Sequence, residues 1–206
     1  MRRTILLILA LLVPPAASVG IAHLMDRARY PRRFEEVVSA RMYRGGFPEA
    51  GQLSRLKQEK SIRTVVSLTQ DLKREKDATL AEEARQEGLR HFRFEMPGDG
   101  RGEYEIMDRA AAAVANPVNW PVFFHCAAGE QRSNAVLAAY RLKYCRWSLD
   151  KVRAELETHG LDLEDPKEAL LWEHIQGYDK WLHTMTPAPT SRPAARDLNH
   201  APPTAP

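Results

Sequence analysis

Cysteine is scarce in this sequence, and neither sign of charge dominates it. Two cysteines in 206 residues cannot form a disulfide framework or a four-cysteine zinc site. The net charge is only +3, because 11 basic against 5 acidic residues within residues 1–60 are offset by 19 against 22 in the remainder. A nucleic-acid-binding protein usually carries a basic stripe along its whole binding face. We therefore expect no nucleic-acid partner.

Long hydrophobic runs are equally rare, and the single one lies at the N-terminus. Residues 4–25 contain no Asp, Glu, Lys or Arg, and as a helix these 22 residues would span about 33 Å, enough to cross a bilayer. The run is interpreted either as an uncleaved single-pass anchor, which makes the membrane a partner, or as a signal peptide with a small-residue cleavage site at 16–18. Four arginines at 27–33 favour an anchor that leaves the domain in the cytoplasm, whereas cleavage would export it.

The chain is predicted to divide into four segments. Residues 1–25 form the anchor or signal peptide, and the arginine-rich residues 26–39 form a basic linker. Residues 40–184 are long enough for one medium-sized domain. Six prolines and no hydrophobic period predict that residues 185–206 form a disordered tail.

Apolar runs predict the strands of the domain. Residues 62–68 and 121–125 are short and rich in β-branched or aromatic side chains, which is typical of buried strands. Residues 89–96 predict a third strand, and residues 41–44 an edge strand. Helical segments separate these runs. The alternation predicts a single α/β domain with a central, mostly parallel sheet of about four to five strands flanked by helices.

Capping residues predict where the helices begin and end. Thr79 and Glu82 form a capping box, so a helix is expected to start there and to end at Gly88. Further helices are expected over residues 103–115, from Ser148 to 158, and from Pro166 towards 183.

The segment with the clearest chemistry is residues 121–141, PVFFHCAAGEQRSNAVLAAYR. Cys126 directly follows an apolar run, so it should lie at the carboxyl end of a buried strand, where open α/β sheets bind ligands. Apolar residues recur at helical spacing after Arg132. The intervening residues therefore form a strand-to-helix loop whose backbone N–H groups converge on an anion; they are Ala127, Ala128, Gly129, Glu130 and Gln131.

Such a loop would ionise Cys126 and bind phosphate with the same groups. A free thiol with a pKa near 8.5 is only about 3% ionised at pH 7, and the loop amides, the helix dipole and Arg132 all favour the thiolate. The planar guanidinium of Arg132 can bind two phosphoryl oxygens at once. In-line attack by Cys126 would form a phosphocysteine, and the Ser133 hydroxyl could then stabilise the departing sulfur.

His125, Cys126, Gly129, Arg132 and Ser133 match the pattern H-C-x5-R-[ST] position by position. The segment resembles the signature loop of the cysteine-dependent protein tyrosine and dual-specificity phosphatases, in their compact bacterial branch. The sequences MYRGG at 42–46 and VVSL at 65–68 resemble other parts of that domain. The resemblance implies a dual-specificity phosphatase-like fold and a phosphoprotein substrate. It also implies hydrolysis without a metal or other cofactor, with His125 orienting the loop.

The resemblance also implies a general acid. The family uses an aspartate on a mobile loop some 30 residues before the cysteine, and Asp99, between two glycines, occupies that place. Glu95 and Glu103 are the alternatives. Relatives that act on inositol phosphates often carry basic residues where this chain has Glu130 and Gln131, so a phosphoprotein is favoured over a phosphoinositide. The sequence leaves open the preference between phosphotyrosine and phosphoserine, and the oligomeric state.

Two other functions remain open from the residues alone. A rhodanese-like sulfurtransferase also uses a cysteine in an anion-binding loop, although its arginine usually lies one residue closer. A catalytically weak, membrane-tethered phosphate-binding module would need the same loop but no general acid.

Overall fold

The computed structural model describes residues 29–69 and 74–185. The predicted anchor or signal peptide and nearly all of the proline-rich tail lie outside the described residues, so the structure tests neither. Within the described ranges, no helix is both long enough and apolar enough to cross a membrane.

Five strands form one sheet in the order β1-β2-β5-β3-β4. The strands are β1 (Glu35–Val38), β2 (Met42–Gly45), β3 (Thr64–Ser67), β4 (Arg90–Arg93) and β5 (Val122–His125). Only the β1–β2 pair is antiparallel; the other three pairs are parallel. The predicted single α/β domain with a mostly parallel sheet is confirmed.

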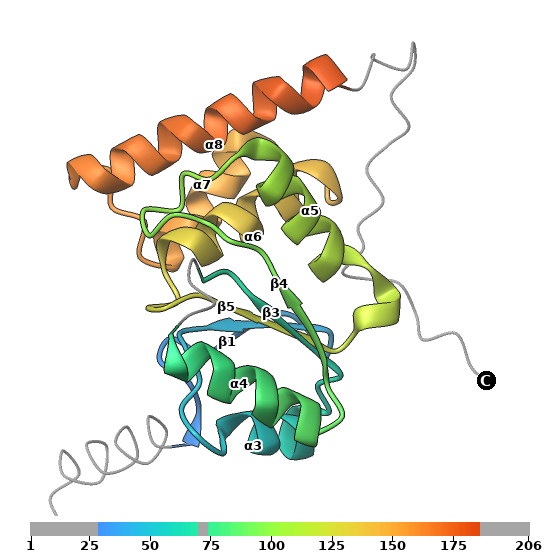
Figure 1. The fold of residues 1–206 in the computed structure, drawn as a ribbon. Coiled ribbons are helices and arrows are strands. Elements are labelled where there is room, and N and C mark those ends of the chain that lie inside the picture. Colours follow the sequence, from blue (N-terminus) through green and yellow to red (C-terminus); the bar gives the residue numbers. More distant parts are fainter. Residues whose placement is uncertain (1–28, 70–73, 186–206) are drawn as a thin grey trace, which may run out of the picture.

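Helices cover both faces of this sheet (Figure 1). The helices are α3 (Gln52–Lys60), α4 (Glu75–Gln86), α5 (Tyr104–Ala115), the 3-10 turn η1 (Pro117–Asn119), α6 (Gln131–Lys143), α7 (Leu149–Thr158) and α8 (Pro166–Met185). In Figure 1, α3 and α4 lie below the sheet and α5 to α8 lie above it. Successive residues of β5 face opposite layers: Phe123 packs in the core with α3 and α4, and Phe124 in the larger core with α5 to α8. Strand β5 is therefore buried on both faces.

The N-terminal boundary of the domain differs from the prediction. Residues 35–38, assigned to a basic linker, form β1, which pairs with β2 from Glu35 opposite Arg44. Residues 41–44 consequently belong to an inner strand and not to an edge strand. Phe34 stacks on Tyr43 of β2 with ring centroids 5.6 Å apart, so the segment before β1 also packs on the core. The tertiary contacts of β1 override a polar local sequence.

One helix start was also predicted wrongly. Helix α4 begins at Glu75, and the Thr79 hydroxyl donates to the Glu75 carbonyl within the helix, so Thr79 is not its cap. The other end is as predicted, since Gly88 adopts a left-handed φ of 65° just after the helix. Ser148 caps α7 as predicted, accepting a hydrogen bond from the Lys151 backbone N–H at 3.4 Å.

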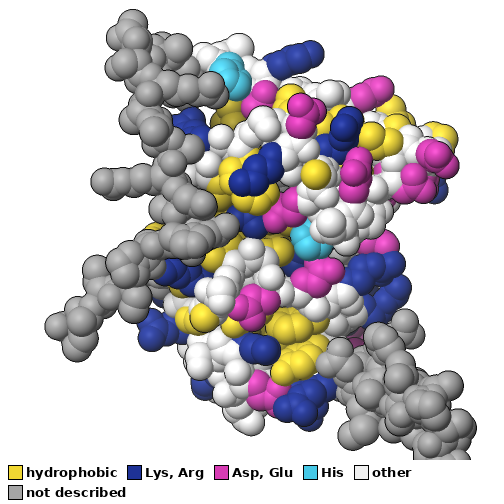
Figure 2. All heavy atoms as spheres, turned by 180° about the vertical axis from the view of Figure 1, so that it is seen from behind, with side chains coloured by type: hydrophobic (Ala, Val, Ile, Leu, Met, Phe, Trp, Pro, Cys, Tyr) yellow, Lys and Arg dark blue, Asp and Glu magenta, His cyan; other side chains and the backbone are white. Residues whose placement is uncertain are grey.

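Basic and acidic side chains are interspersed on the face shown in Figure 2, with small apolar areas between them. No continuous stripe of one charge crosses that face. The expectation that nucleic acid is not a partner stays a prediction.

Candidate active site

The loop between β5 and α6 curls around the sulfur of Cys126. The Gly129 backbone N–H donates to Cys126 Sγ over 3.2 Å, and Cys126 is only 2% exposed. Gly129 has a φ of 78°, in the left-handed region that favours glycine. A Cβ at this position would lie 2.7 Å from the backbone of Gly45 and Gly46, so this close approach also requires glycine.

The end of strand β2 supports the loop from outside. The Cys126 N–H donates to the Gly45 carbonyl at 3.4 Å, and the Phe47 N–H donates to the Ala127 carbonyl at 3.1 Å. Strands β2 and β5 are parallel neighbours, so their carboxyl ends meet at one edge of the sheet. The site thus lies where an open α/β sheet is expected to bind its ligand.

The surroundings of Cys126 favour a thiolate. Burial alone raises the pKa of the thiol, but the Ser133 hydroxyl, the Arg132 guanidinium and the backbone N–H groups of Gly129 and Ser133 together hold that pKa below its ordinary value. Ser133 is fully buried, and beyond its interaction with Cys126 its Oγ has no hydrogen-bond partner among the described residues. Its hydroxyl is therefore available to the sulfur.

Arg132 is fixed at one end and open at the other. Its Nη1 donates to the Leu68 carbonyl at 3.0 Å, and the residue is 9% exposed. Its Nε is buried and has no hydrogen-bond partner among the described residues. A buried unpaired N–H group typically costs about 1–3 kcal/mol. An anion in the loop would remove this cost by accepting a hydrogen bond from Arg132.

His125 orients the loop through a directional hydrogen-bond chain. Its Nδ1 lies 3.3 Å from the Cys126 carbonyl, which can only accept, so Nδ1 carries the proton. The neutral ring then accepts at Nε2 from the Ser67 hydroxyl, 2.8 Å away. Ser67 Oγ in turn accepts from His91 Nε2, also at 2.8 Å. Because Nδ1 donates to a backbone carbonyl and Nε2 faces Ser67, neither ring nitrogen of His125 is placed to take a proton from the Cys126 thiol.

The buried His125 predicts acid sensitivity of folding. Burial lowers the pKa of His125 to about 3, whereas an unfolded chain titrates near 6.5. As the pH falls below 6.5, the unfolded state gains a proton that the folded state does not bind, so stability decreases. From pH 7.5 to 5.5 this group alone should lower the free energy of unfolding by about 1.4 kcal/mol. Urea unfolding at both values should show a smaller decrease for His125→Gln; an equal decrease would contradict the assignment.

Asp99, the predicted general acid, is paired with Arg101, and its neighbour Gly100 packs against the signature loop. Gly100 packs so closely on the loop that a Cβ would lie 2.8 Å from the Gln131 carbonyl carbon. Partial burial raises the pKa of Asp99, but the Arg101 backbone N–H and guanidinium outweigh it and hold the pKa below its ordinary value. The Asp99–Arg101 ion pair is 2.8 Å long. The alternatives Glu95 and Glu103 are both exposed.

The side chains of Glu130 and Gln131 are each held by a residue outside the loop. Arg33 forms an ion pair with Glu130. Glu168 of α8 accepts a hydrogen bond from Gln131 Nε2 at 2.8 Å, and burial raises the pKa of that carboxyl group. Because Arg33 opposes the charge of Glu130, the repulsion of a multiply anionic substrate by this carboxylate is weaker than the sequence suggested.

Three charged side chains that contact the loop were not predicted from the sequence: those of Arg33, Arg44 and Glu168. Arg44 had a detectable signal, because a charged residue in a short, otherwise apolar strand must have a buried partner. It is 1% exposed and donates from Nη2 to the Gly129 carbonyl at 2.7 Å. Arg33 and Glu168 lie in polar segments far from the loop in sequence, and nothing local marks them.

Residues 30–184 match the sequence pattern of the tyrosine phosphatase family. The chain belongs to this family. The predicted relationship to cysteine-dependent phosphatases is thereby confirmed. A search of curated protein sequences found no significant match.

Solved structures of similar fold include several phosphatases. The core catalytic domain of the PP-IP phosphatase SIW14 from S. cerevisiae is 24% identical, with a TM-score of 0.62 over 76% of this chain and 93% of that one. TpbA from P. aeruginosa is 20% identical, with a TM-score of 0.56 over 73% of this chain and 91% of that one. A variant of human DUSP28 is 18% identical, with a TM-score of 0.54 over 76% of this chain and all of that one (100%). These likenesses support the dual-specificity phosphatase-like fold.

Proposed function

We propose that this protein is a phosphoprotein phosphatase of the tyrosine or dual-specificity type. It hydrolyses phosphomonoesters through a phosphocysteine intermediate. One observation carries the proposal: a buried sulfur with a lowered pKa, an inward N–H group and an arginine with an unpaired Nε lie within one loop. These are the groups needed to bind and attack a tetrahedral dianion.

The chemistry proceeds in two steps. The Cys126 thiolate attacks phosphorus in line, while Arg132 and the loop amides of Gly129 and its neighbours bind the equatorial oxygens. Asp99 protonates the leaving oxygen, which requires that it first separates from Arg101. Water then attacks the phosphocysteine and gives a proton to the Asp99 carboxylate left by the first step, while the P–S bond breaks and Ser133 stabilises the departing thiolate.

A phosphoprotein substrate is supported by the chemistry of the loop side chains. Glu130 and Gln131 provide no positive charge for additional phosphate groups, and both are turned to outer partners. The second candidate substrate is an inositol phosphate, favoured by the similarity to the PP-IP phosphatase SIW14 and by the pairing of Glu130 with Arg33.

A substrate panel tests the proposed function. Phosphotyrosyl and phosphoseryl peptides, an inositol pyrophosphate, a phosphoinositide and thiosulfate should be compared by kcat/KM. We expect the highest value for a phosphopeptide. Preference for an inositol substrate would overturn the substrate class and keep the mechanism, whereas turnover of thiosulfate alone would overturn both.

We further propose that residues 4–25 tether the domain to a membrane from its cytoplasmic side. The support is the uncharged run and the arginines that follow it. In intact cells, an added protease should leave the domain uncut; digestion, or an N-terminus beginning near residue 18, would favour the cleaved signal peptide.

The role of Asp99 predicts a dependence on the leaving group. Asp99→Asn should slow hydrolysis of alkyl and phenyl phosphates by about 10²–10⁴-fold, because a general acid contributes most where the leaving oxygen is strongly basic. Hydrolysis of p-nitrophenyl phosphate should slow far less. The matched control is Glu103→Gln, which should change neither rate. An equal decrease for all leaving groups would move the acid role to another residue.

A further inference from the structure

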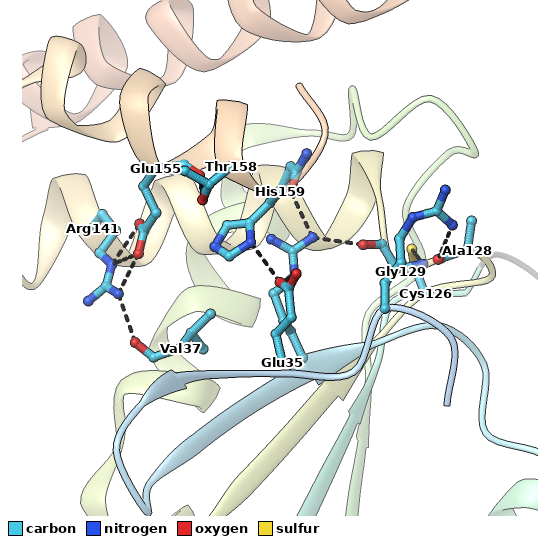
Figure 3. A network of polar contacts seen from close by, with 12 residues as sticks. Glu35, Val37, Cys126, Ala128, Gly129, Arg141, Glu155, Thr158 and His159 are labelled. Carbon is cyan, nitrogen blue, oxygen red and sulfur yellow. Dashed lines mark hydrogen bonds and ion pairs between the residues drawn. The ribbon is translucent and has the colours of Figure 1, made fainter. Parts of the chain in front are cut away.

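Two consecutive carbonyl groups of the signature loop are each held from outside by an arginine. Arg33 Nη1 donates to the Ala128 carbonyl at 3.2 Å, and Arg44 Nη2 donates to the Gly129 carbonyl at 2.7 Å. Figure 3 shows Cys126, Ala128 and Gly129 close together, with the contacts to the two carbonyl groups drawn as dashed lines. Both arginines come from the N-terminal part of the chain and lie outside the pattern H-C-x5-R-[ST].

These contacts orient the amide groups that face the sulfur. In a planar trans peptide, the C=O and N–H groups point in opposite directions. Holding the Ala128 carbonyl outward therefore turns the Gly129 N–H inward, where it donates to Cys126 Sγ at 3.2 Å. Holding the Gly129 carbonyl outward turns the Glu130 N–H towards the same side.

Each arginine also has a carboxylate that balances its charge. Arg33 pairs with Glu130, next to the carbonyl group that it holds. Arg44 lies 3.8 Å from Glu35 of β1, and Glu35 in turn contacts His159 at 2.6 Å. Burial lowers the pKa of Arg44, while the charges of Glu35 and Cys126 raise it. The Arg44 cation and the Cys126 thiolate therefore stabilise each other.

The backbone next to Arg33 is hydrogen-bonded to the residues at the end of β2 that support the loop. The Arg32 carbonyl accepts a hydrogen bond from the Gly46 N–H at 2.6 Å, and Arg33 has a left-handed φ of 51°. Phe34 anchors the turn by stacking on Tyr43. A residue in a strained conformation next to a functional loop suggests that its placement matters.

We propose that Arg33 is a positioning residue of the phosphatase site. By holding the Ala128 carbonyl outward, it keeps the Gly129 N–H aimed at Cys126 and so maintains the acidity of the thiol; Glu130 serves as the counter-charge of Arg33. Its effect on turnover rests on the proposed function, but its effect on thiol acidity does not.

The test measures the pH dependence of Cys126 alkylation by iodoacetamide, in the Cys145→Ser background so that one thiol reacts. Arg33→Ala should raise the midpoint by about half a unit to one unit, because the thiolate loses an oriented hydrogen bond. The kcat for p-nitrophenyl phosphate should fall about tenfold. Arg33→Lys should give smaller changes than Arg33→Ala in both the alkylation midpoint and kcat. The matched control is Arg29→Ala, which removes an exposed arginine of the same segment that pairs with Glu59 of α3 and not with the loop.

A double variant separates orientation from charge compensation. If Arg33 only neutralised Glu130, Arg33→Ala combined with Glu130→Gln would restore the original midpoint; the proposal predicts that the midpoint stays raised. An unchanged midpoint in Arg33→Ala, or a raised midpoint in Arg29→Ala, would overturn the proposal. Because alkylation needs no turnover, an inactive wild-type protein would refute the proposed function and still leave Arg33 testable.

Discussion

Replacing Cys126 by serine is expected to abolish hydrolysis of p-nitrophenyl phosphate, with a decrease of at least about 10⁴-fold. A serine hydroxyl is far less acidic than a thiol, and the site offers it no base. The neighbouring His125 donates from Nδ1 to the Cys126 carbonyl and is neutral, with a pKa lowered by burial to about 3. Arg132 and the loop amides remain, so vanadate or phosphate should still bind.

Two measurements check this expectation. Steady-state kinetics give the loss of turnover, and isothermal titration with vanadate shows whether the anion site survives. Cys145→Ser is the matched control, since Cys145 lies just beyond the far end of α6 and should leave the rate unchanged. Turnover near the wild-type rate in Cys126→Ser would remove the covalent mechanism.

The second large effect is expected for Arg132→Lys, which should lower kcat by about 10²–10³-fold. Lysine keeps the positive charge but replaces the planar fork by a single ammonium group. In the structure one nitrogen of the fork is held by the Leu68 carbonyl while Nε stays free for the substrate. A single ammonium group cannot do both.

The comparison of kcat with KM tests this geometry. Because the charge is retained, KM should change little, and the loss should lie mainly in kcat. Arg85→Lys, on the exposed surface of α4, is the control and should have no effect. A raised KM with an unchanged kcat would show that Arg132 binds substrate only by charge.

The core of the site could be predicted because its signals are contiguous in sequence. An apolar run, a cysteine, a glycine-containing loop and a helical period follow one another within residues 121–141. Local sequence therefore determines a strand, a turn and a helix N-terminus, and the sheet topology places them at one edge. The same argument holds for Ser148 and Gly88, whose effects on helix ends are local.

The parts that could not be predicted depend on contacts between distant segments. Strand β1 has the sequence EEVV and forms because β2 offers it an edge and Phe34 packs on Tyr43. Arg33 reaches a carbonyl group 95 positions later, and Glu168 binds a side chain 37 positions earlier. The capping box at Thr79 was misread because the helix starts one turn before it. Such outcomes are decided by tertiary packing and not by local propensity.

The pairing of β1 with β2 determines where the chain can be shortened. A recombinant protein that begins at residue 40 would lack β1, so β2 would become an edge strand. The backbone N–H and C=O groups that β2 now pairs with β1 would then be open to other molecules. The shortened protein would also lack the aromatic side chain that stacks on Tyr43. We expect such a protein to aggregate, whereas one that begins at residue 29 should remain dispersed, as light scattering at equal concentration would show.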